Sequence, residues 1–176
     1  RYYDLNINPA RKAGTMGAEE SKEMLFWTKE EYLKFAEAMM DKPLSYYAFE
    51  MLYWCGIREG ELLALTPADF DFHNQTVTIN KSYQRLKGRD VITSPKTKKS
   101  NRVVKMPQFL SEEMEDCMKL YYSLKPTDRL FPVTKHYLSH EMDRGCKAAG
   151  VKRIRIHDLR HSHVSLLIDM GFTALA

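Results

Sequence analysis

The stretch 44-LSYYAFEMLYWCG-56 decides the architecture that we expect for this chain. Pro43 precedes it, and proline is favoured in the first turn of a helix because its fixed φ suits that position and no helical hydrogen bond is lost there. The side chains are apolar nearly all round the expected helix, which is typical of a helix surrounded by other elements. Gly56 follows as a C-terminal cap. We therefore predict a central, buried helix that ends at Gly56.

Helical periodicity recurs on both sides of this central helix. Thr28 and Glu31 have the spacing of a capping box, and Trp27 stands before them as a staple residue. Gly150 and Gly171 lie where C-terminal caps are expected. Further helices are predicted over residues 28–41, 58–65, about 108–124, 135–149 and 157–170.

Between the short helix and the one that begins near residue 108, the apolar period changes to two. β-branched residues alternate in 76-TVTIN-80, 89-RDVIT-93 and 102-RVVKM-106, with turn residues at Gly88 and at Ser94-Pro95. These three segments predict one small antiparallel sheet. The expected fold class is therefore α+β, mainly α-helical, with helices packed around that sheet.

The positive charge of the chain is concentrated in one segment. Residues 81–105 hold nine lysines and arginines and one acidic residue, a local net charge of +8 against +4 for the whole chain, so the remaining residues sum to −4. A basic stripe on a slightly acidic body favours a polyanionic partner such as nucleic acid. The alternative is a solvated, lysine-rich hairpin whose charge serves solubility.

Cysteine usage and hydropathy restrict the class of protein further. Cys55, Cys117 and Cys146 are odd in number, far apart and without a CxxC pair, which argues against a disulfide framework or a zinc ribbon. No apolar run approaches the roughly 18 residues that a membrane span needs. We expect a cytoplasmic protein without a membrane partner.

The stretch 156-IHDLRHSHVSLLIDMG-171 gathers titratable groups at the start of an apolar helix. His157, Arg160 and His161 share one helix face at this spacing. An HExxH zinc site would need a glutamate directly after its first histidine, and no cysteine lies nearby, so no metal site is predicted. The isolated His140 and His163 are expected to be hydrogen-bonded core or boundary residues. The apolar residues of the helix are assigned to the core: Leu159, Val164, Leu166, Leu167 and Met170.

An arginine at the edge of an apolar helix needs a partner. The neighbouring Asp158 is one candidate for Arg160. A phosphate would fit better, because the planar guanidinium matches phosphate oxygens at two points. The imidazole of His157 beside it can transfer a proton near neutral pH.

Two further stretches complete a pattern. In 54-WCGIREGELLAL-65, Arg58 follows the buried helix, and in 94-SPKTKKSNRVVKMP-107, Lys96 stands at a hairpin turn. Together with 157-HDLRHSHVSLLIDMG-171 they resemble the two arginine boxes and the lysine hairpin of the tyrosine recombinases, the phage-type integrases. The resemblance implies that residues 24–176 form the catalytic domain of that family, with its fold. It points to integrases of phages and of conjugative mobile genetic elements.

The resemblance implies a site-specific DNA recombinase that integrates DNA by cutting and rejoining it through a covalent 3′-phosphotyrosyl intermediate. Arg58 and Arg160 would stabilise the charge that develops on the phosphate. Lys96, with Lys98 and Lys99 as rivals, would protonate the leaving 5′-oxygen, and His157 would assist. No cofactor is implied, because arginines provide the cationic environment that a metal would otherwise supply. Supporting roles fall to Glu61 and His161, although Glu61 also suits a helix start favoured by the dipole.

The resemblance also implies partners and missing segments. The partners are double-stranded DNA, other copies of the chain as a tetramer on DNA, and accessory DNA-bending proteins. Residues 1–23 are expected to be a linker or the tail of a preceding DNA-binding domain. The last tyrosine is Tyr137, upstream of His157, so the nucleophile is expected beyond Ala176 and the fragment alone is expected to be inactive. DNA contacts are expected from Lys98, Lys99, Arg102 and Arg153.

Two other functions are compatible with these residues. One is a non-catalytic DNA-binding regulator built on the same scaffold. The other is a helical protein-interaction domain whose basic hairpin is incidental. A tyrosine in the downstream coding sequence distinguishes the recombinase from the regulator, and salt-dependent DNA binding excludes the interaction domain.

We predict that replacing Lys98, Lys99 and Arg102 together with alanine weakens binding to duplex DNA of any sequence. Binding with fewer phosphate contacts releases fewer counterions from the DNA. The slope of log affinity against log salt should therefore also become shallower. Binding isotherms at several salt concentrations measure both quantities. Unchanged affinity and slope would remove this segment from the DNA interface.

Overall fold

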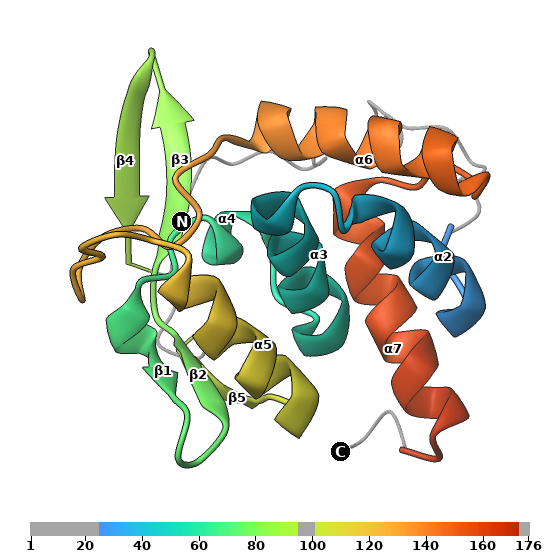
Figure 1. Ribbon diagram of the computed structural model, residues 1–176, viewed down its shortest axis with the longest axis horizontal. Coiled ribbons are helices and arrows are strands. Elements are labelled where there is room, and N and C mark those ends of the chain that lie inside the picture. The colour runs from blue at the N-terminus through green and yellow to red at the C-terminus, as the bar shows by residue number, and fades with distance from the viewer. Residues whose placement is uncertain (1–24, 95–100, 173–176) are drawn as a thin grey trace, which may run out of the picture.

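In the computed structural model, which describes residues 25–94 and 101–172, helix α3 (Pro43–Cys55) lies in the middle of the molecule. Figure 1 shows helices α2, α5, α6 and α7 arranged around it, with the strands at one side. Most of its side chains are buried, and Gly56 ends it in a left-handed conformation with φ of 57°. The prediction of a central helix capped by Gly56 is therefore confirmed.

The remaining helices follow the predicted order; α6 has the predicted bounds and the others are shorter. They are α2 (Lys29–Met39), α4 (Glu59–Leu62), α5 (Gln108–Lys119), α6 (Lys135–Ala149) and α7 (Leu159–Asp169). The capping box of α2 is present: the Thr28 amide donates to Glu31 over 2.9 Å, and the Glu31 amide donates to the Thr28 hydroxyl over 3.3 Å. The short helix expected over 58–65 is a single turn. His157 lies in a separate 3-10 turn (Ile156–Asp158) before α7.

The strands differ from the single predicted sheet. Within the described residues, strands β1 (Phe70–Asp71), β2 (Thr76–Ile79) and β5 (Arg102–Lys105) form one antiparallel sheet, and β3 (Ser82–Leu86) and β4 (Arg89–Thr93) form a separate hairpin. The sequence did not predict β3, because only one of its five side chains, Tyr83, is buried and no clean alternation results. Strand β4 pairs with β3, and β2 pairs with β5. The α+β class is confirmed, and the grouping of the strands into one sheet is wrong.

Aromatic side chains of helix α2 pack against the central helix. Tyr32 of α2 stacks on Tyr53 of α3 with ring centroids 3.6 Å apart, and Phe35 packs edge-on against Phe49 at 4.9 Å. Such pairs contribute about 0.5–1.5 kcal/mol beyond their buried area. The buried Trp27 donates its backbone amide to the Ser162 hydroxyl over 2.9 Å, which attaches the same cluster to α7.

Helix α7 is less buried than its sequence indicated. Leu159 and Leu166 are core residues as expected, but Val164 is 45% and Met170 is 63% exposed. The reason is positional: α7 packs against α3 along one face, and its opposite face lies at the edge of the molecule. Assigning Val164 and Met170 to the core was therefore wrong.

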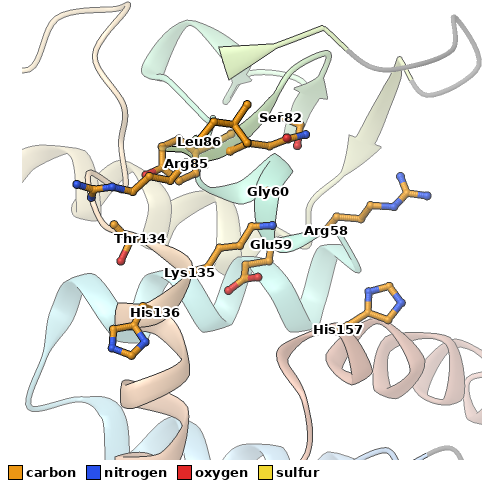
Figure 2. A pocket seen from close by; sticks show the side chains of 12 residues that line it. Arg58, Glu59, Gly60, Ser82, Arg85, Leu86, Thr134, Lys135, His136 and His157 are labelled. Carbon is orange, nitrogen blue, oxygen red and sulfur yellow. The ribbon is translucent and has the colours of Figure 1, made fainter. Parts of the chain in front are cut away.

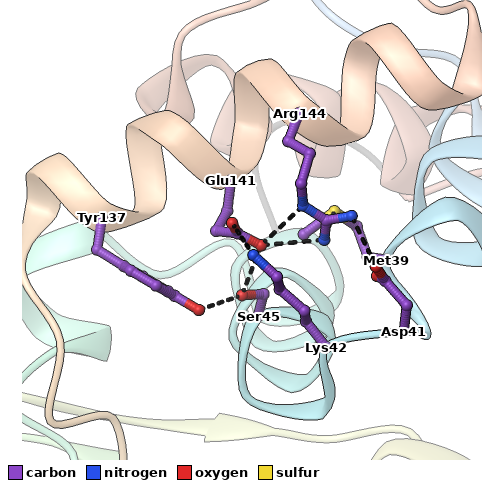
Figure 3. Close-up of polar contacts among 7 residues, drawn as sticks. All are labelled: Met39, Asp41, Lys42, Ser45, Tyr137, Glu141 and Arg144. Atoms are coloured by element: carbon purple, nitrogen blue, oxygen red, sulfur yellow. Dashed lines mark hydrogen bonds and ion pairs between the residues drawn. The ribbon is translucent and has the colours of Figure 1, made fainter.

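A polar network fixes α6 against the turn between α2 and α3 (Figure 3). The buried Glu141 accepts hydrogen bonds from Lys42 over 2.8 Å, from Ser45 over 3.1 Å and from Arg144 over 3.0 Å. Arg144 also pairs with Asp41 over 3.0 Å. Because both charges of a buried ion pair need their partners, these contacts hold α6 in one register.

No helix among the described residues is both long enough and apolar enough to cross a membrane. The expected linker over residues 1–23 lies outside the described residues.

A second buried carboxyl group, Glu50 of α3, has no basic partner in the contacts that fix it. It accepts hydrogen bonds from the Tyr32 hydroxyl over 2.6 Å and from the Trp54 indole over 2.8 Å. Burial raises the pKa of Glu50 to about 7, although these two hydrogen bonds oppose the rise. The carboxyl group is therefore protonated in much of the folded population near neutral pH.

We predict that Glu50→Gln changes the pH dependence of stability in a defined direction. Between the ordinary pKa of 4.5 and the folded value of about 7, the folded state of the wild type holds a proton that the unfolded state has lost. Its free energy of unfolding therefore falls as pH rises, by at most about 1.4 kcal/mol per pH unit from this group. Glutamine does not titrate, so the free energy of unfolding of the variant should rise relative to that of the wild type as pH increases through this range.

Urea unfolding at pH 4.5 to 8 measures this difference. Glu37→Gln, at an exposed position on α2, provides the baseline. A difference between the Glu50 variant and the wild type that does not change with pH would contradict the prediction.

Candidate active site

The end of the buried helix positions the first arginine. After Gly56, the buried Ile57 keeps the chain against the core, and Arg58 is the N-terminal cap residue of α4 in an extended conformation. Its backbone is therefore fixed by a packed helix on one side and by a helical turn on the other. The side chain remains 54% exposed, so its guanidinium faces solvent.

The buried carboxylate of Glu61 organises the arginines around it. It accepts the Arg58 amide over 2.8 Å and the Arg58 guanidinium over 3.0 Å. Arg102 of β5 donates both terminal nitrogens to the two oxygens of Glu61, over 3.0 Å and 2.8 Å. Burial alone would raise the pKa of Glu61, but the hydrogen bonds from Arg102 and Arg58 outweigh it and hold the pKa below its ordinary value. Glu61 is therefore ionised at neutral pH.

Arg160 reaches the same place from the other end of the sequence. Its Nη1 donates to the carbonyl oxygen of Gly56 over 2.7 Å, two residues before Arg58. Burial lowers the pKa of Arg160, and the charges of Arg58 and Arg102 lower it further, while Glu61 acts in the opposite direction. The two predicted arginines are thus brought together, with Arg102 and Glu61 as neighbours.

His157 faces the same opening as Arg58 (Figure 2). Both line a cleft of about 790 Å³ between the β3–β4 hairpin and the start of α6. The His157 and His161 rings pack edge-on with centroids 5.6 Å apart. The Asp158 carboxylate is bound by a different arginine, because it accepts from Arg155 over 2.8 Å. The suggestion that Asp158 is the partner of Arg160 is therefore wrong.

Other predicted residues lie elsewhere. Lys96, Lys98 and Lys99 fall in the segment 95–100, outside the described residues. Arg153 pairs with Asp143 of α6 and donates to the Ile154 carbonyl, and it lines a shallow hollow that also contains His157. Arg153 is thus on the same side of the molecule as the cleft without belonging to it.

Four charged or histidine side chains of the cleft were not predicted from the sequence. Glu59, Arg85, Lys135 and His136 line it together with Arg58 and His157 (Figure 2). They come from α4, from the unpredicted strand β3 and from the start of α6, so only their tertiary arrangement reveals them. Burial raises the pKa of Glu59, although Lys135 opposes the rise.

Of the two histidines expected to be core or boundary residues, His163 lies at the boundary and His140 does not. His140 is exposed and approaches His136 with 3.2 Å between the two Nε2 atoms. Within the described ranges no group of three or more metal-ligating side chains converges. His163 is partly buried, and its Nδ1 is enclosed without a hydrogen-bond partner. Burial lowers the pKa of His163, so the ring is neutral near pH 7.

The ring of His163 lies directly against Gly56. A Cβ atom added to Gly56 would lie 2.4 Å from the His163 Cδ2, which real contacts do not allow. Glycine is also favoured here because the φ of 57° is left-handed. The same residue therefore ends α3, receives Arg160 on its carbonyl oxygen and accommodates a ring from α7.

Residues 25–174 match the phage integrase family. The integrase of ICEBs1 from Bacillus subtilis is 34% identical over 164 residues, which are 85% of this chain and 45% of that protein. The integrase of Staphylococcus phage L54a is 28% identical over 146 residues, covering 73% of this chain and 41% of the relative. The chain thus spans about half the length of the curated relatives it matches.

Solved structures show the same fold. The Tn1549 transposon integrase in complex with transposon right end DNA superposes with a TM-score of 0.78 at 20% identity, covering 97% of this chain and 62% of that chain. XerA recombinase gives a TM-score of 0.69 at 21% identity, covering 90% of this chain and 54% of that chain.

We predict that Gly56→Ala destabilises the protein more than Gly150→Ala. Both glycines are left-handed, with φ of 57° and 65°, and an added Cβ at Gly150 would contact nothing within 4 Å. Backbone strain of about 1–2 kcal/mol is common to both variants. The clash with His163 should add about 1 kcal/mol or more at Gly56 alone.

Urea unfolding of the two variants measures this difference. Equal losses would show that the His163 ring moves aside freely, and that it does not fix the end of α3.

Proposed function

Because the chain belongs to the phage integrase family, we propose that it is the catalytic domain of a site-specific DNA recombinase. The proposed reaction cuts and rejoins DNA through a covalent 3′-phosphotyrosyl intermediate. The observation that carries the proposal is the meeting of two arginines and a histidine from distant parts of the chain. Arg160 binds the carbonyl group two residues before Arg58, and His157 lines the same cleft as Arg58.

The arginines suit a phosphodiester because of their charge and shape. Attack on phosphorus places additional negative charge on the non-bridging oxygens, and guanidinium groups aimed at them stabilise it where it develops. Arg58 and Arg160 are proposed for this role. Their mutual repulsion is reduced by Glu61, which lies among them as the only buried carboxylate that contacts Arg58 in the described residues.

Proton transfer is proposed for His157 and Lys96. A tyrosine hydroxyl loses its proton to water as its oxygen bonds to phosphorus, the bond to the 5′-oxygen breaks, and the leaving oxygen takes a proton. Lys96 is proposed as the donor, and His157 assists because imidazole exchanges protons near neutral pH. The nucleophile is proposed on a segment beyond Ala176, because all ten tyrosines of this sequence precede His157. Supporting roles are proposed for Glu61 and His161.

Double-stranded DNA is the proposed partner, bound by the cleft and the basic residues around it. Support comes from the similar fold of the Tn1549 integrase and of a lambda integrase dimer, both solved with DNA. DNA contacts are proposed for Lys98, Lys99 and Arg153. Arg102, which the sequence also assigned to DNA contact, has both terminal nitrogens on Glu61. Assembly into a tetramer on DNA, accessory DNA-bending proteins and a cytoplasmic location are proposed with the recombinase function. Residues 1–23 are proposed as the connection to a further DNA-binding domain.

We predict that Arg160→Ala, in a full-length protein that carries the proposed tyrosine, lowers the single-turnover rate of DNA cleavage about 10²–10³-fold. Arg160→Lys should lower it less than Ala does but still measurably, because lysine keeps the charge and loses the two-point geometry. The covalent protein–DNA product, separated on a denaturing gel, gives the rate. The unfolding temperature should fall by only a few degrees, because the alanine variant loses the hydrogen bond to Gly56 and also the repulsion from Arg58 and Arg102.

Two outcomes contradict this prediction. Cleavage at the wild-type rate by the alanine variant would remove Arg160 from the chemistry. Absence of cleavage by the wild type on any cognate site, with salt-dependent DNA binding retained, would favour a DNA-binding regulator instead.

A further inference from the structure

Glu61 is bound to two arginines that differ in their surroundings. Arg102 is 28% exposed and uses both terminal nitrogens on the carboxylate, whereas Arg58 is 54% exposed and uses only Nη1. Arg102 is thus the more enclosed partner and makes the two-point contact. Arg58 has no other side-chain hydrogen bond in the part of the chain that the structure describes, and more than half of its side chain is exposed.

The charge balance of this group explains why two arginines are needed. Glu61 is buried and ionised, and a buried carboxylate without a matching cation is strongly unfavourable. If Arg58 were its only partner, the carboxylate would draw the Arg58 guanidinium inward to complete a two-point pair. That movement would take the guanidinium away from the cleft. Arg102 neutralises the carboxylate from the other side. The positive charge of Arg58 is therefore not needed to balance Glu61 and can act on a ligand.

We propose that Arg102 is a positioning residue for DNA cleavage, which neutralises Glu61 so that Arg58 stays turned toward the phosphate. This inference rests on the proposed recombinase function and refines the role of Arg102, which the sequence assigned to DNA contact. Arg102 acts through Glu61 and Arg58, from a strand whose start is joined to α4 by this ion pair.

The inference distinguishes rate from affinity. Arg102→Ala in the full-length protein should lower the single-turnover cleavage rate at saturating DNA about 10²-fold, because a displacement of about 1 Å at the reacting centre has an effect of that size. The dissociation constant for duplex DNA and its salt dependence should change little. Lys98→Ala with Lys99→Ala provides the comparison, since loss of DNA contacts weakens affinity and makes the salt slope shallower.

A second substitution tests the route through Glu61. Glu61→Gln removes the buried charge that Arg102 balances, so the double variant Glu61→Gln/Arg102→Ala should cleave faster than Arg102→Ala alone. Arg102→Lys, which keeps a cation beside Glu61, should also exceed the alanine variant. All rates are measured at least 15 °C below the lowest unfolding temperature of the series, as about this margin keeps the variants folded. Equal rates for the single and double variants would overturn the inference.

A structural measurement is independent of cleavage. In a crystal structure of the 176-residue chain carrying Arg102→Ala, the Arg58 guanidinium should contact both oxygens of Glu61. An Arg58 side chain that stays in its present place, with one nitrogen on Glu61, overturns the proposed role of Arg102. Lack of cleavage by the wild-type protein overturns the recombinase function but not this result, so the two failures are distinguishable.

Discussion

The hydrogen bond from Arg160 to the carbonyl oxygen of Gly56 joins two segments that lie 104 residues apart. Its acceptor belongs to the end of the central helix α3, and its donor belongs to α7, which packs along that helix. A side chain attached to rigid elements on both sides has little freedom. The position of the candidate site is therefore fixed by the core, although its charged groups face solvent.

The arginines around this bond repel one another, and the fold compensates for that repulsion locally. The pKa of Arg160 is lowered first by burial and then by Arg58 and Arg102. A single ionised Glu61 cannot neutralise three guanidinium groups, so the cluster keeps a net positive charge. Such a cluster is most stable when an anion occupies it, which links its construction to phosphate binding.

Sequence reasoning succeeded where the determining contacts are local. The capping box of α2 and the ends of α3 and α6 depend on residues within one turn, and the structure has them where they were expected. It failed where a residue had several partners within reach. Asp158 lies within three residues of both Arg155 and Arg160 in the sequence. The geometry of the turn pairs its carboxylate with Arg155. Strand pairing failed similarly, because Tyr83 alone marks β3 as partly buried.

The site itself was predictable only as far as the family motifs reach. Arg58, His157 and Arg160 stand in those motifs, whereas Lys135 and His136 reach the cleft because the Glu141 network holds α6 in place. The ion pair between Glu61 and Arg102 spans 41 residues and joins a helix to a strand. No periodicity in the sequence connects two such positions.

The buried carboxyl groups of this fold are of two kinds: some bind basic side chains, and one lies in the core without a basic partner. Among the described residues, Glu50, Glu61 and Glu141 are the buried glutamates. Glu61 is bound by Arg102 and Arg58, and Glu141 is bound by Lys42 and Arg144. These contacts outweigh burial and keep the pKa of both carboxyl groups low. Glu50 has only a tyrosine and a tryptophan as donors, and burial raises its pKa to about 7. A buried glutamate with a lowered pKa is therefore ionised, and its negative charge holds a basic side chain in a defined position.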